Sequence, residues 1–216
     1  MMRSSTAQLY GITTPLLCRD SRTLRAGAQA ALRAGLRWLQ YRHKHASTDT
    51  ARRQALLLTN LCKDHGATLL INDRLPLAED LGVGVHLGRG DTPVATARRR
   101  LGPAALIGAT CHGDVDYALA CLADGASYAS IGRLYASTTK PTAPSTPLQC
   151  LRELRARTDG SLCAIGGIGE RELAAVSGAG ADLVAVGAAL FDTDDVAAAA
   201  TRMLAALSTA NSQYPT

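Results

Sequence analysis

Three polar side chains stand at alternate positions in one strand-like segment of the chain. Gln40, Arg42 and Lys44 lie two residues apart within residues 36–44. Successive side chains of a β-strand point to opposite faces, so this spacing predicts that all three share a face. Burying an amide, a guanidinium and an ammonium group without partners costs several kcal/mol for each group. We therefore expect an anionic ligand opposite them; the alternative is an exposed edge strand with solvated charges.

Carboxylates follow the next two predicted strands. Asn72 and Asp73 end one of these strands, and Asp91 follows the strand after it. Proteins usually hold Mg²⁺ by one or two carboxylates together with phosphate oxygens. Two carboxylates on adjacent loops therefore predict a magnesium site, with Asp73 and Asp91 as its ligands. The alternative role for Asp73 is to cap the helix that follows.

Two further segments have the composition of phosphate sites. One loop offers hydroxyl groups, backbone N–H groups and an ammonium group, from Ser137, Thr138, Thr139 and Lys140. The segment Ala164–Gly169 leaves a predicted strand and opens a helix, where glycines let the backbone approach an anion. Val186 and Gly187 end the last predicted strand, beside that segment.

The polar residues thus form two groups, each suited to an anion. One group is basic and metal-assisted: Arg42, Lys44, Asn72, Asp73, Asp91 and Lys140. The other is an uncharged backbone cradle at Gly167, Val186 and Gly187. His86 and His112 lie near strand ends, where packing or hydrogen bonding is the commoner role. With no evident general base, the arrangement predicts stabilisation of a departing pyrophosphate beside a monophosphorylated reactant.

Eight strand-and-helix units in 216 residues must position these groups. Helical segments separate short apolar strands predicted at residues 8–13, 38–42, 68–72, 84–87, 105–110, 128–132, 161–166 and 182–187. This pattern predicts an α/β chain folded as a single (β/α)8 TIM barrel, in which the loops after the strands converge on one site. An open doubly wound sheet is the alternative, but no glycine-rich nucleotide motif follows the first strand. We expect one domain over residues 1–216, with frayed ends at 1–7 and 208–216.

Composition limits the partners. The net charge of +5 would suit nucleic acid, but aromatic residues, at 4%, do not interleave with the scattered arginines. A small anionic substrate explains the charge as well. No run of about 18 apolar residues could span a membrane, residues 1–8 show no secretory pattern, and the six cysteines form no Cys-x-x-Cys pair. We expect a cytoplasmic protein without nucleic-acid or membrane partners; a homo-oligomer is left open.

The motifs, taken in order, identify a family. They are Gln40–Lys44, Ile71–Arg74, Gly84–Gly88, Gly108–His112, Thr139-Lys140 and Ala164–Ile168. From Leu9 to about Phe191 the chain resembles the thiamine-phosphate synthase (thiamine-phosphate pyrophosphorylase) family. The resemblance implies a (β/α)8 barrel and a transferase of thiamine biosynthesis (EC 2.5.1.3). Such an enzyme joins hydroxymethylpyrimidine diphosphate to thiazole phosphate, with Mg²⁺, and releases pyrophosphate.

The resemblance also implies residue roles. Gln40 and Thr110 would contact the pyrimidine, Thr110 standing where the family commonly has Ser. The diphosphate would be held by Arg42, Lys44, Asn72 and Lys140, and Mg²⁺ by Asp73 and Asp91. The thiazole phosphate would be held by Ser137, Thr139, Gly167, Val186 and Gly187. Tyr41, His43 and Thr138 lie inside these motifs and are counted with the substrate-binding residues. Arg42, Lys44 and Lys140 would act catalytically, neutralising charge as pyrophosphate leaves a pyrimidine carbocation.

The chain departs from the family pattern at four places. Gly132-Arg133 replaces Gly-Pro, and the loop Tyr135–Thr138 lacks the usual Pro and first Thr. Arg89-Gly90 replaces Gln-Glu, and Thr13-Thr14 stands where an Asp is frequent. Two alternative functions stay open: a thiazole tautomerase-like isomerase, which has no need of the basic strand, and a non-catalytic phosphate-ligand binding protein.

Overall fold

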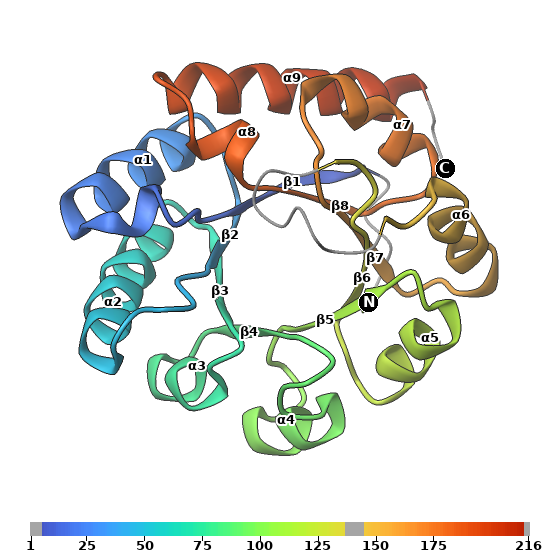
Figure 1. Ribbon diagram of the computed structural model, residues 1–216, viewed down its shortest axis with the longest axis horizontal. Coiled ribbons are helices and arrows are strands. Elements are labelled where there is room, and N and C mark those ends of the chain that lie inside the picture. Colours follow the sequence, from blue (N-terminus) through green and yellow to red (C-terminus); the bar gives the residue numbers. More distant parts are fainter. Residues whose placement is uncertain (1–5, 137–144, 214–216) are drawn as a thin grey trace.

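Eight parallel strands close into a barrel surrounded by helices in the computed structural model (Figure 1). The structure describes residues 6–136 and 145–213. Each strand pairs with its neighbours in sequence, and β1 closes the ring against β8. The prediction of a (β/α)8 TIM barrel is therefore confirmed. The strands are β1 (Gln8–Ile12), β2 (Trp38–Tyr41), β3 (Thr68–Asn72), β4 (Gly84–Leu87), β5 (Ile107–His112), β6 (Tyr128–Ile131), β7 (Ser161–Ile165) and β8 (Leu183–Val186).

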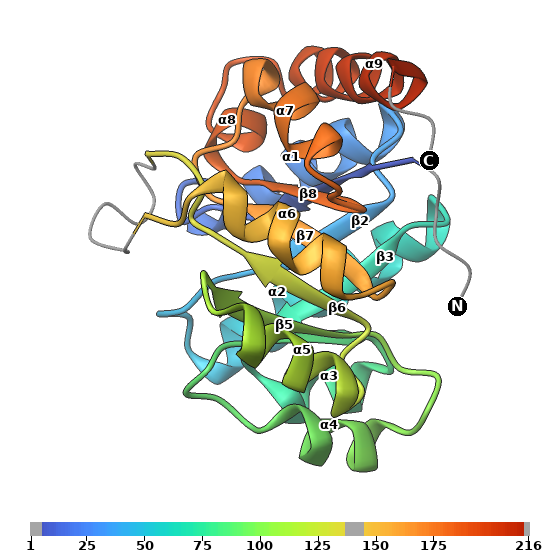
Figure 2. The ribbon, with the colours of Figure 1, turned by 90° about the vertical axis from the view of Figure 1, so that its right-hand side faces the viewer.

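Helices cover the outside of the barrel (Figure 2). Asp20, Ser47 and Asp114 cap three of them, each side chain accepting from a backbone N–H group that has no partner inside the helix. None of the helices in the described residues is long and apolar enough to cross a membrane. The helices are α1 (Ser21–Arg33), α2 (Thr48–Asp64), α3 (Leu75–Leu81), α4 (Val94–Leu101), α5 (Val115–Ala123), α6 (Leu148–Arg157), α7 (Leu173–Gly178), α8 (Ala188–Phe191) and α9 (Val196–Gln213), with short 3-10 turns η1 (Leu17–Arg19) and η2 (Glu170–Glu172).

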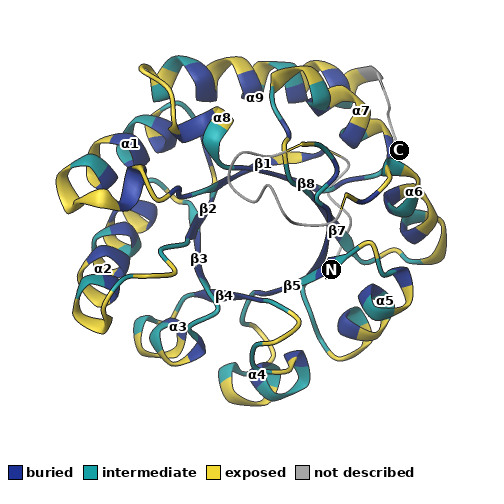
Figure 3. Ribbon diagram, viewed as in Figure 1, coloured by how far each residue is buried: buried dark blue, intermediate teal, exposed yellow. Residues whose placement is uncertain are grey.

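Alternating side chains along the strands divide the core into two layers. One layer, which includes Leu39 and Ile71, packs between the strands and the helices. The other fills the barrel itself and consists of Tyr10, Leu70, Tyr128, Cys163, Leu183 and Ala185. Figure 3 shows the result: the strands are buried around the ring, and exposed residues lie on the outer faces of the helices. The inside of the barrel is thus a filled core.

Strand β2 is shorter than predicted. It ends at Tyr41, so Gln40 lies on the strand while Arg42 and Lys44 lie in the loop that follows. The ladder with β1 stops here because the Arg42 N–H group donates to the Thr13 hydroxyl, at 2.8 Å, instead of to a strand carbonyl. The prediction that one strand presents all three polar side chains on one face is therefore wrong.

The two ends of the described chain are held together. Asn211 on α9 accepts a hydrogen bond from the Ala7 N–H group at 2.9 Å and donates to the Ala7 carbonyl at 3.1 Å. Ala7 and Ala210 are both buried. Helix α9 continues to Gln213, so the expected fraying does not hold at Ala7 or at residues 208–213. Residues 1–5 and 214–216 lie outside the described residues.

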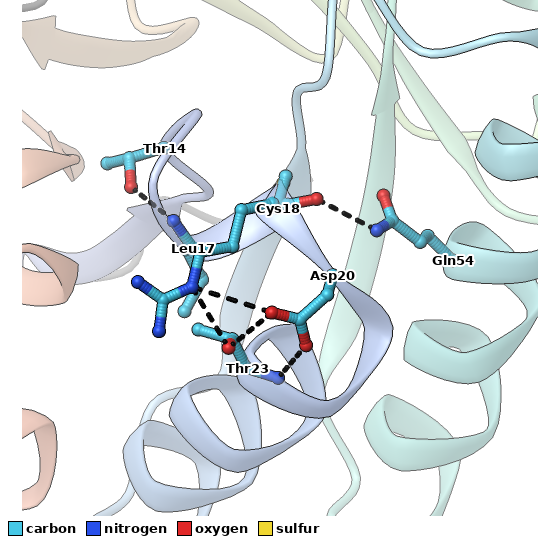
Figure 4. A network of polar contacts seen from close by, with 7 residues as sticks. Thr14, Leu17, Cys18, Asp20, Thr23 and Gln54 are labelled. Carbon is cyan, nitrogen blue, oxygen red and sulfur yellow. Dashed lines mark hydrogen bonds and ion pairs between the residues drawn. The ribbon is translucent and has the colours of Figure 1, made fainter.

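Side-chain contacts fix the loop after β1, which leads to the mouth of the barrel. The Thr14 hydroxyl accepts from the Leu17 N–H group at 3.1 Å, and the Gln54 amide donates to the Cys18 carbonyl at 2.9 Å (Figure 4). Gln54 is almost fully buried and also accepts from the Tyr41 hydroxyl. This one side chain therefore joins α2 to the first loop and to the end of β2.

Candidate active site

A cavity of about 330 Å³ opens at the carboxyl ends of the strands. That end of a (β/α)8 barrel is where the loops after the strands meet, and where such proteins carry their active sites. Six of the positions assigned to substrate binding line the cavity, from five different parts of the chain: Gln40, Arg42, Asn72, Thr110, Gly167 and Gly187. The barrel therefore brings together residues up to 147 positions apart (Gln40 to Gly187).

A smaller groove of about 140 Å³ lies beside this cavity. Asn72 lines both spaces and so marks where they meet. The groove is lined by Tyr41, His43, Lys44, Asn72, Asp73 and Arg74. Tyr41 and His43 both hydrogen-bond to Gln54, which holds them at the edge of the groove. Arg42 thus faces the main cavity, and Lys44 faces the groove.

Asp73 and Asp91 come together between the two loops. Lys44 Nζ lies 3.2 Å from Asp73 Oδ2. Burial and the neighbouring Asp73 carboxylate raise the pKa of Asp91. Burial also opposes ionisation of Asp73, but the contact with Asp91 and the Lys44 ammonium outweigh it and lower the pKa of Asp73. The two carboxyl groups thus lie in contact, and together they offer four oxygen atoms to a cation.

The carboxylate pair suits a divalent cation that keeps other ligands. No cluster of three or more His, Cys, Asp or Glu side chains with ligand geometry occurs within residues 6–136 and 145–213. A cation at Asp73 and Asp91 would therefore complete its shell with water or phosphate oxygens, as Mg²⁺ commonly does. Asp73 does not cap α3, whose N-cap is Arg74 with no side-chain hydrogen bond. The capping role considered for Asp73 is thus wrong, and its carboxylate stays available.

Arg42 supplies a cation to the wall of the cavity. Burial lowers the pKa of this guanidinium, and the nearby Asp73 carboxylate partly offsets that effect. The group stays charged, because an arginine retains its proton even after such a shift. No side-chain hydrogen bond joins Arg42 to another residue in the described part of the chain. A half-buried guanidinium with this freedom is suited to bind an anion bidentately.

Hydrogen bonds run from Gln40 across the inside of the barrel to Thr110. The Gln40 amide donates to the Tyr10 hydroxyl at 2.8 Å, which lies 2.9 Å from the Tyr128 hydroxyl. Tyr128 bonds to His86 Nδ1 at 2.9 Å, and His86 Nε2 to Thr110 Oγ1 at 2.8 Å. The sequence interpretation assigned His86 to packing or hydrogen bonding, and the latter is confirmed. It missed Tyr10 and Tyr128, whose only signal was an inward position on a strand.

The loop after β6 lies directly against the glycines that follow β7. The N–H groups of Leu134 and Tyr135 donate to the carbonyls of Ile165 and Gly166, each at 3.0 Å. Gly167 has φ +66°, and a Cβ atom there would lie 2.2 Å from the Ala136 carbonyl oxygen. Glycine is therefore required at this position by backbone geometry and by the neighbouring loop, a reason that the sequence alone did not reveal.

The residues assigned to the thiazole phosphate lie partly at the cavity and partly outside the described residues. The Val186 side chain is buried in the outer core, so only its backbone can face the cavity. Gly187 lines the cavity directly before α8. Ser137, Thr138, Thr139 and Lys140 lie outside the described residues. Ala136, the last residue before them, lines the cavity.

Arg89 and Thr14, two of the residues at which the chain departs from the family pattern, have partners in the structure. Arg89 pairs with Asp114, and its guanidinium lies 4.1 Å from the centre of the Tyr117 ring. It thereby joins the loop that carries Asp91 to the start of α5. Thr14 donates a hydrogen bond to Asp192. A carboxylate from the end of α8 thus reaches the start of the first loop, where this chain has Thr13 and Thr14.

Known proteins resemble this chain over most of its length. Residues 9–190 match the family model described as thiamine monophosphate synthase. The thiamine-phosphate synthase of Thioalkalivibrio sulfidiphilus is 46% identical over 198 residues, 91% of this chain and 93% of that protein. That of Chromobacterium violaceum is 46% identical over 193 residues, 89% of this chain and 92% of that protein. The solved structure of thiamine phosphate pyrophosphorylase from Pyrococcus furiosus superposes with a TM-score of 0.83 at 26% identity, covering 94% of this chain and 96% of that one.

Proposed function

The chain belongs to the thiamine-phosphate synthase family, and on that premise we propose how the cavity at the mouth of its barrel binds two substrates. The activity is that of thiamine-phosphate synthase, a transferase of thiamine biosynthesis, EC 2.5.1.3. It implies phosphorylated substrates, which we take to be a pyrimidine diphosphate and a thiazole phosphate.

The diphosphate binds where the main cavity meets the side groove. Arg42 faces this point from the cavity, Asn72 lines both spaces, and Lys44 faces the groove. The observation that carries the assignment is the pair Asp73 and Asp91, whose carboxyl groups are in contact next to two cationic side chains. Such a pair suits a divalent cation that a diphosphate brings with it.

Mg²⁺ is the cation that fits this pair. Its ligands would be Asp73, Asp91 and diphosphate oxygens, and when bound it would supply positive charge to the leaving pyrophosphate. Lys44 then keeps a second role: its ammonium, now 3.2 Å from Asp73, remains close enough to meet a phosphate oxygen. Tyr41 and His43 contact the substrate only along the groove that they line, because Gln54 holds both side chains.

The pyrimidine ring lies deeper in the cavity, between Gln40 and Thr110. Both side chains line the cavity and both belong to the hydrogen-bonded set inside the barrel. The thiazole phosphate lies on the opposite side, against the backbone at Gly167, Val186 and Gly187. We assign Ser137, Thr138 and Thr139 to the thiazole phosphate and Lys140 to the diphosphate, as the family resemblance implies; Ala136, the residue before them in the sequence, lines the cavity.

The reaction is dissociative and needs no general base. The C–O bond to the diphosphate breaks with its electron pair leaving on pyrophosphate, and the pyrimidine methylene becomes a carbocation. The thiazole nitrogen lone pair then forms the C–N bond, so no proton changes place. Arg42, Lys44 and Lys140 stabilise the charge that grows on the leaving group, which is electrostatic catalysis by fixed donors.

We infer the protein's location from its thiols. All six cysteines are free, and five of them are buried. Free thiols persist in reducing compartments, which favours the cytoplasm for this biosynthetic enzyme.

A two-substrate assay tests the proposed function. Purified protein, both substrates and Mg²⁺ should give thiamine phosphate and pyrophosphate in equal amounts. Arg42→Ala should lower this activity about 100-fold or more, as the loss of one charge-stabilising donor does. Arg25→Ala, on the exposed face of α1, is the matched control and should retain full activity. Binding of both substrates without formation of either product would instead show a non-catalytic binding protein.

A further inference from the structure

One unbroken set of hydrogen bonds joins five strands through the centre of the barrel. We call it the relay: Gln40 on β2, Tyr10 on β1, Tyr128 on β6, His86 on β4 and Thr110 on β5. Its four bonds measure 2.8, 2.9, 2.9 and 2.8 Å in that order. Only its two ends and His86 line the cavity. The two tyrosines lie beneath it, each 1% exposed.

The direction of the relay is set at its first bond. The Gln40 amide nitrogen donates to the Tyr10 hydroxyl, so Tyr10 must place its own hydrogen elsewhere. Within the described residues the other polar partner of Tyr10 is the Tyr128 hydroxyl, and that of Tyr128 is His86 Nδ1. Burial raises the pKa of both tyrosines, so both keep their protons. Tyr10 therefore donates to Tyr128, and Tyr128 donates to His86.

The far end of the relay follows from the histidine. Because Nδ1 of His86 accepts a hydrogen bond, a neutral imidazole carries its proton on Nε2. Nε2 then donates to Thr110 Oγ1, which lies 2.8 Å away. The Thr110 hydroxyl accepts this bond and keeps its own hydrogen for another acceptor. At the cavity wall, Thr110 is thus a donor, while Gln40 presents its carbonyl oxygen as an acceptor.

Close packing holds the relay in one arrangement. The His86 and Tyr128 rings stack with centres 5.6 Å apart, and Tyr10 meets Tyr128 edge-on at 6.0 Å. Gly108 provides the space: a Cβ atom there would lie 2.2 Å from the Tyr128 ring and 2.5 Å from His86 Nδ1. The rings therefore hold their oxygen and nitrogen atoms in place, and the direction of the bonds follows from the Gln40 amide that donates to Tyr10.

We propose that Tyr10, Tyr128 and His86 are positioning residues that fix Gln40 as an acceptor and Thr110 as a donor, and so select an aminopyrimidine. An exocyclic amine donates to Gln40, and a ring nitrogen accepts from Thr110. A pyrimidine with an oxo group in place of the amine presents a carbonyl oxygen to the Gln40 oxygen, leaving two acceptors face to face. The inference rests on the proposed function, which places the pyrimidine between Gln40 and Thr110.

The first test determines the tautomer of His86 and needs no substrate. Two-bond ¹H–¹⁵N correlation spectra of the free protein should show His86 as the Nε2–H tautomer, its signals assigned by their loss in His86→Gln. Tyr128→Phe removes the donor to Nδ1, so a mixture of tautomers should appear. Ser127→Ala is the matched control: it removes a hydroxyl that accepts from the Ile107 N–H group, next to Tyr128 in the chain but outside the relay, and should leave the tautomer unchanged. A Nδ1–H tautomer or an imidazolium in the parent protein would overturn the inference.

The second test measures specificity by binding. Dissociation constants of the amino- and oxo-pyrimidine diphosphates, measured by calorimetry with Mg²⁺ and without thiazole phosphate, should differ by about 100-fold or more in the parent protein. The ratio should fall about tenfold in Tyr128→Phe and in Tyr10→Phe, while affinity for inorganic pyrophosphate stays the same. Ser127→Ala should keep the parent ratio. Using both tyrosine variants keeps the test decisive if one of them does not fold.

The outcomes separate the inference from the function on which it rests. An unchanged ratio in both folded tyrosine variants, with thiamine phosphate still formed by the parent protein, shows that the relay is only structural and overturns the inference. If the parent protein binds neither pyrimidine diphosphate and forms no thiamine phosphate, the proposed function itself is wrong. A ratio that falls together with the change of tautomer supports both.

Discussion

Replacing Asp91 by Asn should stabilise the metal-free protein and abolish its response to Mg²⁺. Asp91 and Asp73 have their carboxyl groups in contact, and burial together with Asp73 raises the pKa of Asp91. At neutral pH and above, the two negative charges repel each other. The introduced amide keeps an oxygen to accept from the Gly88 N–H group, which donates to Asp91 at 2.7 Å, and its NH₂ group can donate to Asp73. The variant therefore removes the repulsion without losing these contacts.

The magnitude follows from the distance and the exposure. Two unit charges about 4 Å apart interact by about 1 kcal/mol in water and about 4 kcal/mol at the dielectric of a protein surface. The Asp73 side chain is 25% exposed and Asp91 is only partly buried, so we take the lower value. In a chain of this length about 1 kcal/mol corresponds to about 2–4 °C in Tm. That gain is the expected result at pH 8 in the presence of a chelator.

The gain should depend on pH in a definite direction. Because the pKa of Asp91 is raised in the folded chain, the folded state holds this proton more tightly than the unfolded state. The stability that Asp91 contributes is full below its unfolded pKa, about 3.9, and is lost as pH rises through the folded pKa. The difference in Tm between Asp91→Asn and the parent should therefore be small near pH 4 and grow toward pH 8.

Thermal unfolding with and without Mg²⁺ and inorganic pyrophosphate provides the assay. A ligand at one hundred times its Kd stabilises the parent protein by about 2.7 kcal/mol, and Asp91→Asn should lose this stabilisation. Asp116→Asn serves as the matched control, since Asp116 is exposed and pairs with Arg157 on the outside of the barrel. The reasoning is refuted if Mg²⁺ with pyrophosphate stabilises Asp91→Asn as much as the parent, or if the metal-free variant melts no higher at pH 8.

Three further changes test other parts of the structure. Gly167→Ala should raise the KM for thiazole phosphate and also lower Tm, because its Cβ would meet the Ala136 carbonyl. Steady-state kinetics and a melting curve would check the two effects, and an unchanged Tm would contradict that contact. Lys140→Ala should lower turnover about 100-fold with little change in either KM. Single-turnover release of pyrophosphate measures the effect, and a loss of less than about fivefold would place Lys140 outside the site. Asn211→Ala should lower the free energy of unfolding by about 1–3 kcal/mol, because two hydrogen bonds to Ala7 are lost. The kcat measured on the same preparation should be unchanged, and an unchanged free energy of unfolding would show that these bonds contribute nothing.

The sequence by itself determined the barrel and most of its strands. Apolar segments at regular spacing predicted all eight, and the predicted bounds of β3 and β4 are those observed. This succeeded because a strand buried on both faces needs a nearly continuous apolar run, which is visible in one dimension. The same reasoning placed polar residues at the strand ends. In a barrel these ends must converge, which is why Gln40, Arg42, Asn72 and Thr110 line one cavity.

Only the tertiary structure decided which partners each of these residues contacts. The end of β2 could not be predicted, because it is set by a hydrogen bond to Thr13 from the neighbouring loop. The need for glycine at position 167 comes from Ala136 in another loop. Tyr10 and Tyr128 resemble ordinary core residues in sequence, and their order with His86 exists only once the strands are side by side. Composition and spacing specify which groups are available, whereas the direction of each hydrogen bond depends on partners that lie far away in the chain and close together in space.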